Sequence, residues 1–159
     1  MKRPWNRTNQ NIYSLITFNE SNIFNMNICT YVSVINMQPK IYAISIDYNT
    51  LTYLNLNKNN NNYVLQGLST NNIDTVKVLG KKSGLNYDKN NYLTKKKLIT
   101  NWGKYSILNN LSFVIELKEK KKIYEMKDHA LFIFQVKKFK NFNNKLLTLN
   151  NLIEKKIVL

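Results

Sequence analysis

Short strand-like segments without regular strand–helix alternation are the feature that most restricts the fold of this chain. Residues 12–18 alternate along their length and carry β-branched and aromatic side chains, a pattern typical of a half-buried strand. Five further segments have similar character. The expected strands are residues 12–18, 27–35, 41–48, 63–68, 111–117 and 130–139. Such a series favours a mainly β barrel over a doubly wound sheet.

Two segments predict short helices. In residues 50–56, leucines recur at nearly helical spacing after Thr50, which is a good capping residue. In residues 71–79 the apolar side chains share one helical face, Asn71 or Asn72 offers a cap, and Gly80 follows as a stop signal. We expect two short helices beside the barrel.

The remaining segments predict little regular structure. Residues 80–91 are polar and glycine-containing, so we expect them to be irregular. The basic segment 118–122 should connect the two long strands, and residues 123–126 could extend their pairing. Residues 146–159 are apolar and basic, which fits a strand followed by a short helix or an edge. At 159 residues and 43% hydrophobic, residues 1–159 are expected to form one domain.

The net charge of +15 admits two explanations. One is a basic nucleic-acid-binding barrel, since cationic surfaces release counterions from phosphate backbones. The other is codon bias, because Asn, Lys, Ile and Tyr are heavily used and lysine outnumbers arginine by 22 to 2. Nucleic-acid readers usually rely on arginine. We favour codon bias, and expect salt-sensitive adhesion to polyanions without a specific nucleic-acid partner.

The side chains exclude several chemistries. Cys29 and His129 are the only cysteine and histidine, so a zinc site built from protein ligands is not expected. A single cysteine forms no intrachain disulfide and suits a reducing cytoplasm. A Cys29–His129 nucleophilic pair is a formal alternative, but a thiol in an apolar strand is usually inert. The chain has no glycine-rich nucleotide-binding motif, and polar residues interrupt its one long uncharged stretch. An enzyme of this composition would need a cofactor.

Four short motifs carry a family resemblance. They are Asn-Met-Asn-Ile-Cys-Thr-Tyr-Val-Ser at 25–33 followed by Met-Gln-Pro at 37–39, Asn-Thr-Leu-Thr at 49–52, Gly-Lys-Lys-Ser-Gly at 80–84 followed by Asp88-Lys89, and Asp128-His129. Together they resemble the flavin reductase-like, FMN-binding split-barrel family. The resemblance spans most of the chain, and it implies a six- or seven-stranded split barrel with a few short helices.

The resemblance also implies a set of site residues. Asn27, Cys29, Thr30 and Tyr31 would line the flavin ring and its ribityl chain. Thr50 and Thr52, at a helix start, and Lys81 and Lys82 would hold the phosphate, with Lys89 a weaker candidate. His129 would lie in the pocket, where Asp128 could fix its tautomer. Each motif alone also has an ordinary structural interpretation, as a core strand, helix caps, a solvated charge run or a structural histidine.

The implied function is that of a homodimeric oxidoreductase with FMN in a groove between subunits. It would transfer electrons from NADH or NADPH to FMN, and then to free flavin or a protein acceptor. The open alternatives are an FMN-binding electron carrier without a nicotinamide site and the basic nucleic-acid-binding barrel.

Two residues depart from the family pattern, since Lys127 and Phe134 stand where glycines are common. Phe134 is expected to add bulk near the cofactor or the partner subunit.

Overall fold

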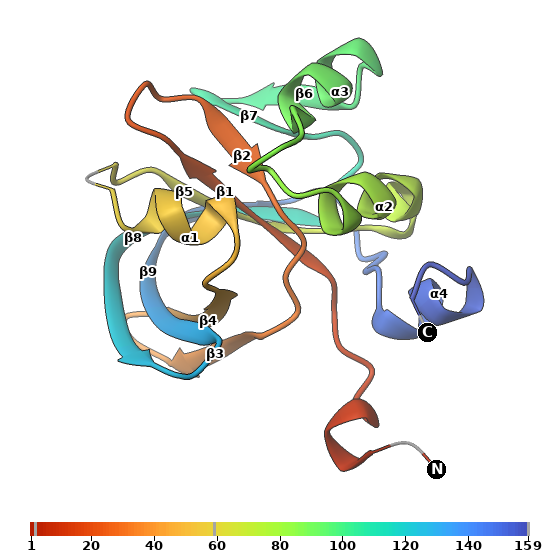
Figure 1. Ribbon diagram of the computed structural model, residues 1–159, viewed down its shortest axis with the longest axis horizontal. Helices are drawn as coiled ribbons and strands as arrows, with labels where there is room; N and C mark the ends of the chain where they lie inside the picture. Colours follow the sequence, from red (N-terminus) through yellow and green to blue (C-terminus); the bar gives the residue numbers. More distant parts are fainter. Residues whose placement is uncertain (2, 59, 159) are drawn as a thin grey trace.

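The computed structural model describes residues 1, 3–58 and 60–158, and its largest element is an antiparallel sheet (Figure 1). Seven strands form this sheet in the order β2-β1-β5-β8-β9-β4-β3, and β6 and β7 form a separate hairpin. The strands are β1 (Tyr13–Phe18), β2 (Phe24–Met26), β3 (Val32–Asn36), β4 (Ile41–Asp47), β5 (Tyr63–Gly67), β6 (Ile99–Trp102), β7 (Tyr105–Leu108), β8 (Phe113–Glu125) and β9 (His129–Asn141). The helices are η1 (Pro4–Asn6), α1 (Leu51–Leu56), η2 (Thr70–Asn72), α2 (Ile73–Lys81), α3 (Lys89–Lys95) and α4 (Leu149–Glu154). The predicted mainly β split barrel is confirmed.

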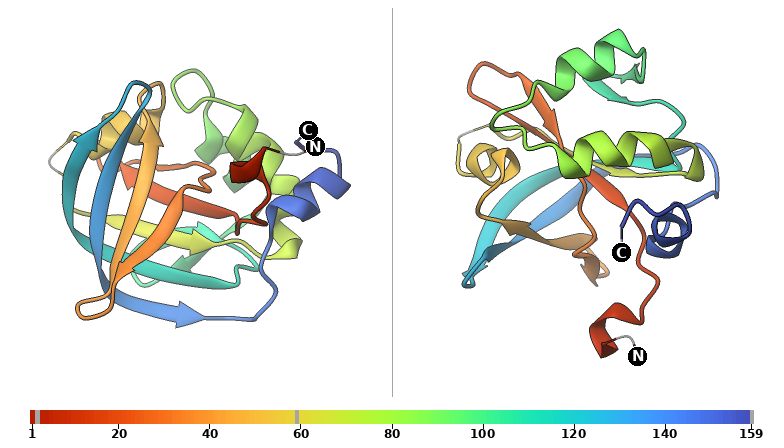
Figure 2. Two further views of the ribbon diagram at one scale, coloured as in Figure 1. Left: turned by 90° about the horizontal axis from the view of Figure 1, so that it is seen from below. Right: turned by 45° about the vertical axis from the view of Figure 1, so that its right-hand side comes forward.

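The barrel is closed by residues 27–31, which form no regular strand. β2 and β3 are consecutive in the sequence but lie at opposite ends of the sheet order, so the chain between them crosses the open side of the curled sheet (Figure 2). Tyr13 and Cys29 exchange two backbone hydrogen bonds of 3.0 and 2.9 Å, and the Ser45 N–H donates to the Tyr31 carbonyl at 3.0 Å. The predicted strand over 27–35 is therefore wrong before Val32, because a segment that bridges two edges cannot pair continuously with either.

Apolar residues on the two faces of the sheet form two separate cores. β5 is buried along its whole length. Leu15 and Leu65 point into the barrel interior, whereas Ile16 and Val64 pack on the other face with residues of α2, α4 and the β6–β7 hairpin. This double burial explains why residues 63–68 are almost continuously apolar.

Phe134 belongs to the barrel interior. It is fully buried, and its ring makes an edge contact with Tyr63 at a centroid distance of 5.3 Å. The expectation that its bulk lies near a cofactor is wrong for the pocket described below, because the side chain points to the opposite, interior face of β9.

Two helix boundaries differ from those predicted. α2 continues through Gly80 to Lys81, and the Lys82 N–H still donates to the Val78 carbonyl at 3.1 Å. A glycine costs a helix only about 1 kcal/mol, so it does not by itself end one. Within the supposedly irregular residues 80–91, α3 begins at Lys89, where the Asp88 carboxylate accepts from the Asn91 N–H at 2.9 Å.

The strand pairing is more extensive than expected. The basic segment 118–122 belongs to β8, which pairs with β9 up to Glu125 opposite Ala130. Lys121 and Lys122 are exposed, so their charges stay in water, whereas Lys120 Nζ donates to the Leu56 carbonyl and burial lowers its pKa. The β6–β7 hairpin was not predicted. No helix among the described residues is long and apolar enough to cross a bilayer.

Candidate functional site

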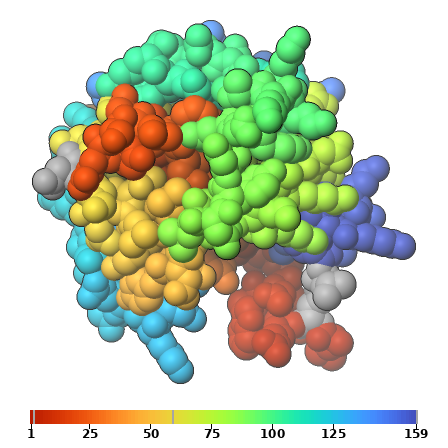
Figure 3. Space-filling model, turned by 45° about the horizontal axis from the view of Figure 1, so that its top comes forward, coloured from red at the N-terminus to blue at the C-terminus, as the bar shows by residue number. Residues whose placement is uncertain are grey.

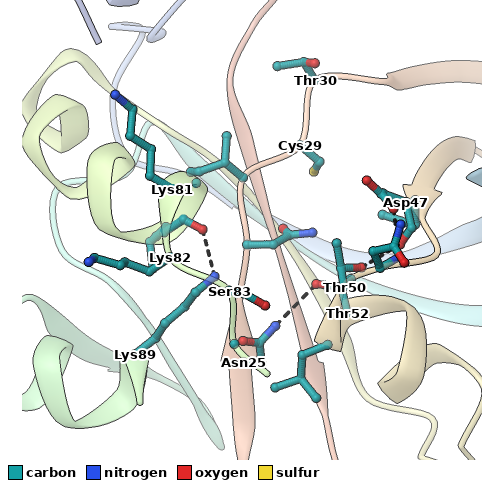
Figure 4. A pocket seen from close by; sticks show the side chains of 18 of the residues that line it. Asn25, Cys29, Thr30, Asp47, Thr50, Thr52, Lys81, Lys82, Ser83 and Lys89 are labelled. Carbon is teal, nitrogen blue, oxygen red and sulfur yellow. Dashed lines mark hydrogen bonds between the residues drawn. The ribbon is translucent and has the colours of Figure 1, made fainter. Parts of the chain in front are cut away.

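A pocket of about 430 Å³ lies where the barrel is split. One wall is residues 27–31, a second is the end of β4 with the start of α1, and the third is the end of α2 with residues 82–84 (Figure 4). All nine residues predicted for the site line this pocket: Asn27, Cys29, Thr30, Tyr31, Thr50, Thr52, Lys81, Lys82 and His129. Its volume falls within the roughly 300–1,000 Å³ of small-molecule sites.

The wall formed by residues 27–31 offers neutral polar groups. The Asn27 side-chain oxygen accepts a hydrogen bond from the Leu15 N–H at 2.8 Å, which fixes that amide. Cys29 is buried, and burial raises the pKa of its thiol to about 12. A thiol protonated at neutral pH is a poor nucleophile. The raised pKa of the Cys29 thiol thus argues against a Cys29–His129 nucleophilic pair.

The hydroxyl groups at the start of α1 already have structural partners. Thr50 Oγ1 donates to the Asp47 carbonyl at 2.8 Å and accepts from the Tyr53 N–H at 3.1 Å, which confirms the predicted cap. Thr52 is almost fully buried, and its Oγ1 accepts from Asn25 Nδ2 at 3.3 Å. α1 has only six residues, so its macrodipole is small. These hydroxyls shape the pocket more than they offer free donors.

Three lysines lie on the opposite wall, and they differ in burial. Lys81 and Lys82 are exposed and point away from Thr50 (Figure 4); the Lys82 ammonium lies 5.6 Å from the centroid of the Tyr87 ring. Lys89 is 6% exposed and points inward. Its Nζ donates to the carbonyls of Leu79 at 2.8 Å and Met26 at 3.0 Å, and burial lowers its pKa to about 8.

The lysine-bearing wall meets the α1 wall closely at Gly84. A Cβ added at Gly84 would lie 2.5 Å from Asn25 Oδ1 and 3.0 Å from Leu51 Cδ2. Figure 3 shows the green segment after α2 packed directly beside the yellow-orange residues around α1. Any larger residue would force the loop or these side chains apart, so the glycine lets the loop close one end of the pocket.

An aromatic pair forms the rim of the pocket. Tyr31 is 59% exposed, and its ring lies 5.7 Å from the His129 ring, centroid to centroid. His129 Nδ1 lies 2.7 Å from Asp128 Oδ1, and this hydrogen bond lowers the pKa of the Asp128 carboxyl. The expected Asp128–His129 contact is therefore present, and it orients the imidazole.

Sequence reasoning missed several pocket residues. They are Asn25, Ser45, Asp47, Asn49 and Ser83. Asn25, Asn49 and Ser83 lie inside the quoted motifs and could have been included. Ser45 and Asp47 carried no signal beyond their position in a strand. Lys89 was ranked below Lys81 and Lys82, since sequence does not reveal which of several lysines is buried.

The side chains around the pocket define what it can bind. Amides, hydroxyls and backbone groups dominate, the cations lie on one wall, and the Asp47 carboxylate lies on the other. Within the described part of the chain, no group of His, Cys, Asp and Glu could hold a metal ion. The donor set fits a neutral polar ring system carrying an anionic group, as FMN does. A split barrel with such a pocket defines a class of small-molecule-binding β proteins.

The chain belongs to the flavin reductase like domain family, whose model matches residues 6–152. No curated protein matches it. Solved structures share the fold at low identity. An FMN-binding protein from Thermus thermophilus is 18% identical over 89% of this chain and 75% of its own, with a TM-score of 0.73. The NADH:FAD oxidoreductase SgcE6 of Streptomyces globisporus is 9% identical over 88% and 80%, with a TM-score of 0.72.

A larger protein also shares this fold. A Sinorhizobium meliloti 1021 protein is 12% identical and has a TM-score of 0.75. The match covers 93% of this chain but 51% of that protein, so the chain spans about half of its length. At these identities the likeness concerns the fold alone.

Proposed function

We propose that this protein binds FMN in the pocket at the split of the barrel and transfers electrons from NADH or NADPH to flavin. The observation that carries the proposal is the convergence of four sequence motifs, up to about a hundred residues apart, on one pocket. Family membership supports flavin chemistry, and the names of the Thermus and Streptomyces proteins support FMN binding and NADH use.

The proposal gives each wall a role. Residues 27–31 would present backbone and amide groups to the polar edge of the ring without adding a charge. Bound FMN would supply the two-electron chemistry, and no protein acid or base is required for hydride transfer between rings. Tyr31 and His129 would border the face that a nicotinamide approaches. The lysine-bearing wall would attract the phosphate.

We also propose a cytoplasmic homodimer with the FMN groove completed by the second subunit. Exposed apolar side chains on the interior-facing side of the sheet support this, since Val34 is 48% and Phe139 65% exposed beside a cavity of about 380 Å³. Large exposed apolar groups on one face commonly mark an interface. Light scattering of the purified protein tests the dimer, and a monomer at all concentrations would contradict it.

The decisive experiment has two stages. First, the purified protein is titrated with FMN while flavin fluorescence is followed, and saturable quenching is expected. Second, the FMN complex is mixed anaerobically with NADH or NADPH, and bleaching of the visible flavin band on the timescale of turnover is expected.

Other results would point elsewhere. Binding without bleaching by either nucleotide would contradict the reductase and favour an electron carrier. A colourless protein that does not quench FMN but shifts RNA at physiological salt would overturn flavin binding and favour the nucleic-acid alternative.

A further inference from the structure

Three lysines lie on one wall of the pocket, and Lys89 is the one whose ammonium donates hydrogen bonds to backbone carbonyls. Lys81 and Lys82 are exposed and extend away from the pocket, so solvent screens their charges. Lys89 is 6% exposed and lines the pocket. A buried cation acts on a neighbouring anion more strongly than a solvated one does, because the local dielectric is lower.

The contacts of Lys89 join two walls. Its Nζ donates to Met26 O at the end of β2 at 3.0 Å and to Leu79 O near the end of α2 at 2.8 Å. Residues 27–31 follow Met26 directly, and Lys81 and Lys82 follow Leu79 closely. Lys89 therefore fixes the spacing of the strand segment and the lysine-bearing wall.

An ammonium group has three N–H donors, and the two carbonyls accept two of them. A buried ammonium is costly unless its remaining donor finds an acceptor or an anion lies near it. Asp47 lies on the far wall, so an anionic group in the pocket is drawn toward Lys89 and repelled from the α1 side.

We propose that Lys89 is a specificity-determining and positioning residue that makes this pocket prefer a phosphorylated flavin over riboflavin. This inference rests on the proposed flavin function and deepens it. In this proposal Lys89, and not the exposed Lys81 and Lys82, provides most of the attraction for the flavin phosphate.

The first test compares FMN with riboflavin, which has the same ring and ribityl chain but no phosphate. Both dissociation constants are measured by fluorescence quenching for the wild type, Lys89→Met and Lys89→Gln. Met removes the charge and both donors, while Gln keeps two N–H donors without the charge. In both variants the preference for FMN should fall about tenfold or more. Lys95→Met, the same change at an exposed site of α3, should leave the preference unchanged.

The second test uses the wild type alone, so it holds even where a variant fails to fold. Burial lowers the pKa of Lys89 to about 8. The preference for FMN should therefore fall as the pH rises from about 7 to 9.5. The other titratable or charged groups that line this pocket or adjoin Lys89 are Cys29, Tyr31, Asp47, Lys81, Lys82, Tyr87, Asp88 and His129. A soluble Lys89 variant should lack this pH-dependent step.

The outcomes separate the two proposals. Wild type that binds neither flavin would overturn the proposed function and this inference together. Wild type that binds FMN with a preference independent of pH, or Lys89 variants that lose both flavins equally, would overturn the inference alone and reduce Lys89 to a structural clamp.

Discussion

The rings of Tyr31 and His129 lie 5.7 Å apart, centroid to centroid, and are inclined by 57° at the rim of the pocket. Tyr31 comes from the segment that closes the barrel and His129 from the start of β9, almost a hundred residues later. Tyr31 and Thr30 also line an adjoining polar groove. Tyr31 therefore lies between the pocket and the groove, with His129 beside it on the pocket side.

Replacing this pair should affect electron donation more than FMN binding. For Tyr31→Ala and His129→Asn, we expect the rate at which NADH reduces bound FMN to fall about tenfold, because the approaching nicotinamide loses its orientation. The FMN dissociation constant should change by less than about threefold, since the cationic wall is untouched. Stopped-flow absorbance and fluorescence titration measure the two quantities. Tyr124→Ala, at a 65% exposed site of β8, is the matched control.

Gly84→Ala should weaken FMN binding. The added Cβ would lie 2.5 Å from Asn25 Oδ1, so either the loop or the Asn25 and Leu51 side chains of the facing wall have to move. We expect this shift of a pocket wall to lower the affinity for FMN by about tenfold or more. Gly80→Ala is the matched glycine substitution, and its effect is measured by thermal unfolding. Its Cβ would lie an ordinary 3.4 Å from Ile28, and alanine should stabilise α2 by about 0.5–1 kcal/mol. Equal FMN affinity in Gly84→Ala and wild type would contradict the close approach.

Glu116 should make stability depend on pH in the acid range. Its side chain is buried, with the residue 3% exposed. Glu116 Oε1 accepts hydrogen bonds from the Tyr105 hydroxyl at 2.7 Å and from Lys137 Nζ at 3.0 Å. Glu116 Oε2 lies 3.3 Å from Lys138 Nζ. Burial alone would raise the pKa of Glu116, but the hydrogen bonds from Tyr105 and the two lysines outweigh it and lower that pKa. Its contribution to stability is thus complete above the ordinary value of about 4.3 and is lost as the pH falls toward the lowered folded-state pKa.

The test is urea unfolding of Glu116→Gln at several pH values. At pH 7 this variant should lose about 2 kcal/mol of unfolding free energy, because a charged hydrogen-bond acceptor is removed from a buried site. The loss should shrink below pH 4. Glu119→Gln removes the same charge at an exposed site, where the ion pair with Lys118 is 3.6 Å long, and should cost less than about 0.5 kcal/mol. The same loss in both variants would show that Glu116 has no special role.

Cys29 should be unreactive in the folded protein. Because burial raises the pKa of its thiol to about 12, almost no thiolate exists at pH 8. Labelling with an aromatic disulfide reagent should be slow in the native state and complete within seconds in guanidinium. Cys29→Ala should retain FMN binding. Rapid native labelling, or loss of flavin binding on alanine substitution, would contradict an inert packing role.

Local pattern predicted the strands that have one partner on each side and a buried face. β1, β4 and β5 were placed within one residue, since alternation or continuous apolarity reports burial directly. The same reasoning failed for residues 27–31, which look like a strand but bridge two sheet edges. It also failed for Gly80, where the helix continues, and for the lysines of β8, whose pairing with β9 is decided by the partner strand.

The mainly β barrel and the cap at Thr50 followed from the chain alone, because hydrophobic periodicity and capping chemistry are local properties. The segments that line the pocket were implied by the family resemblance. How those segments meet depends on the folded arrangement of the whole chain. This arrangement paired Tyr31 with His129, engaged Thr52 with Asn25, and buried Lys89 while leaving Lys81 and Lys82 in solvent. The physical reason is that burial and charge strength depend on which distant segments pack together, and identical lysines in a sequence acquire different roles only when the fold gives them different surroundings.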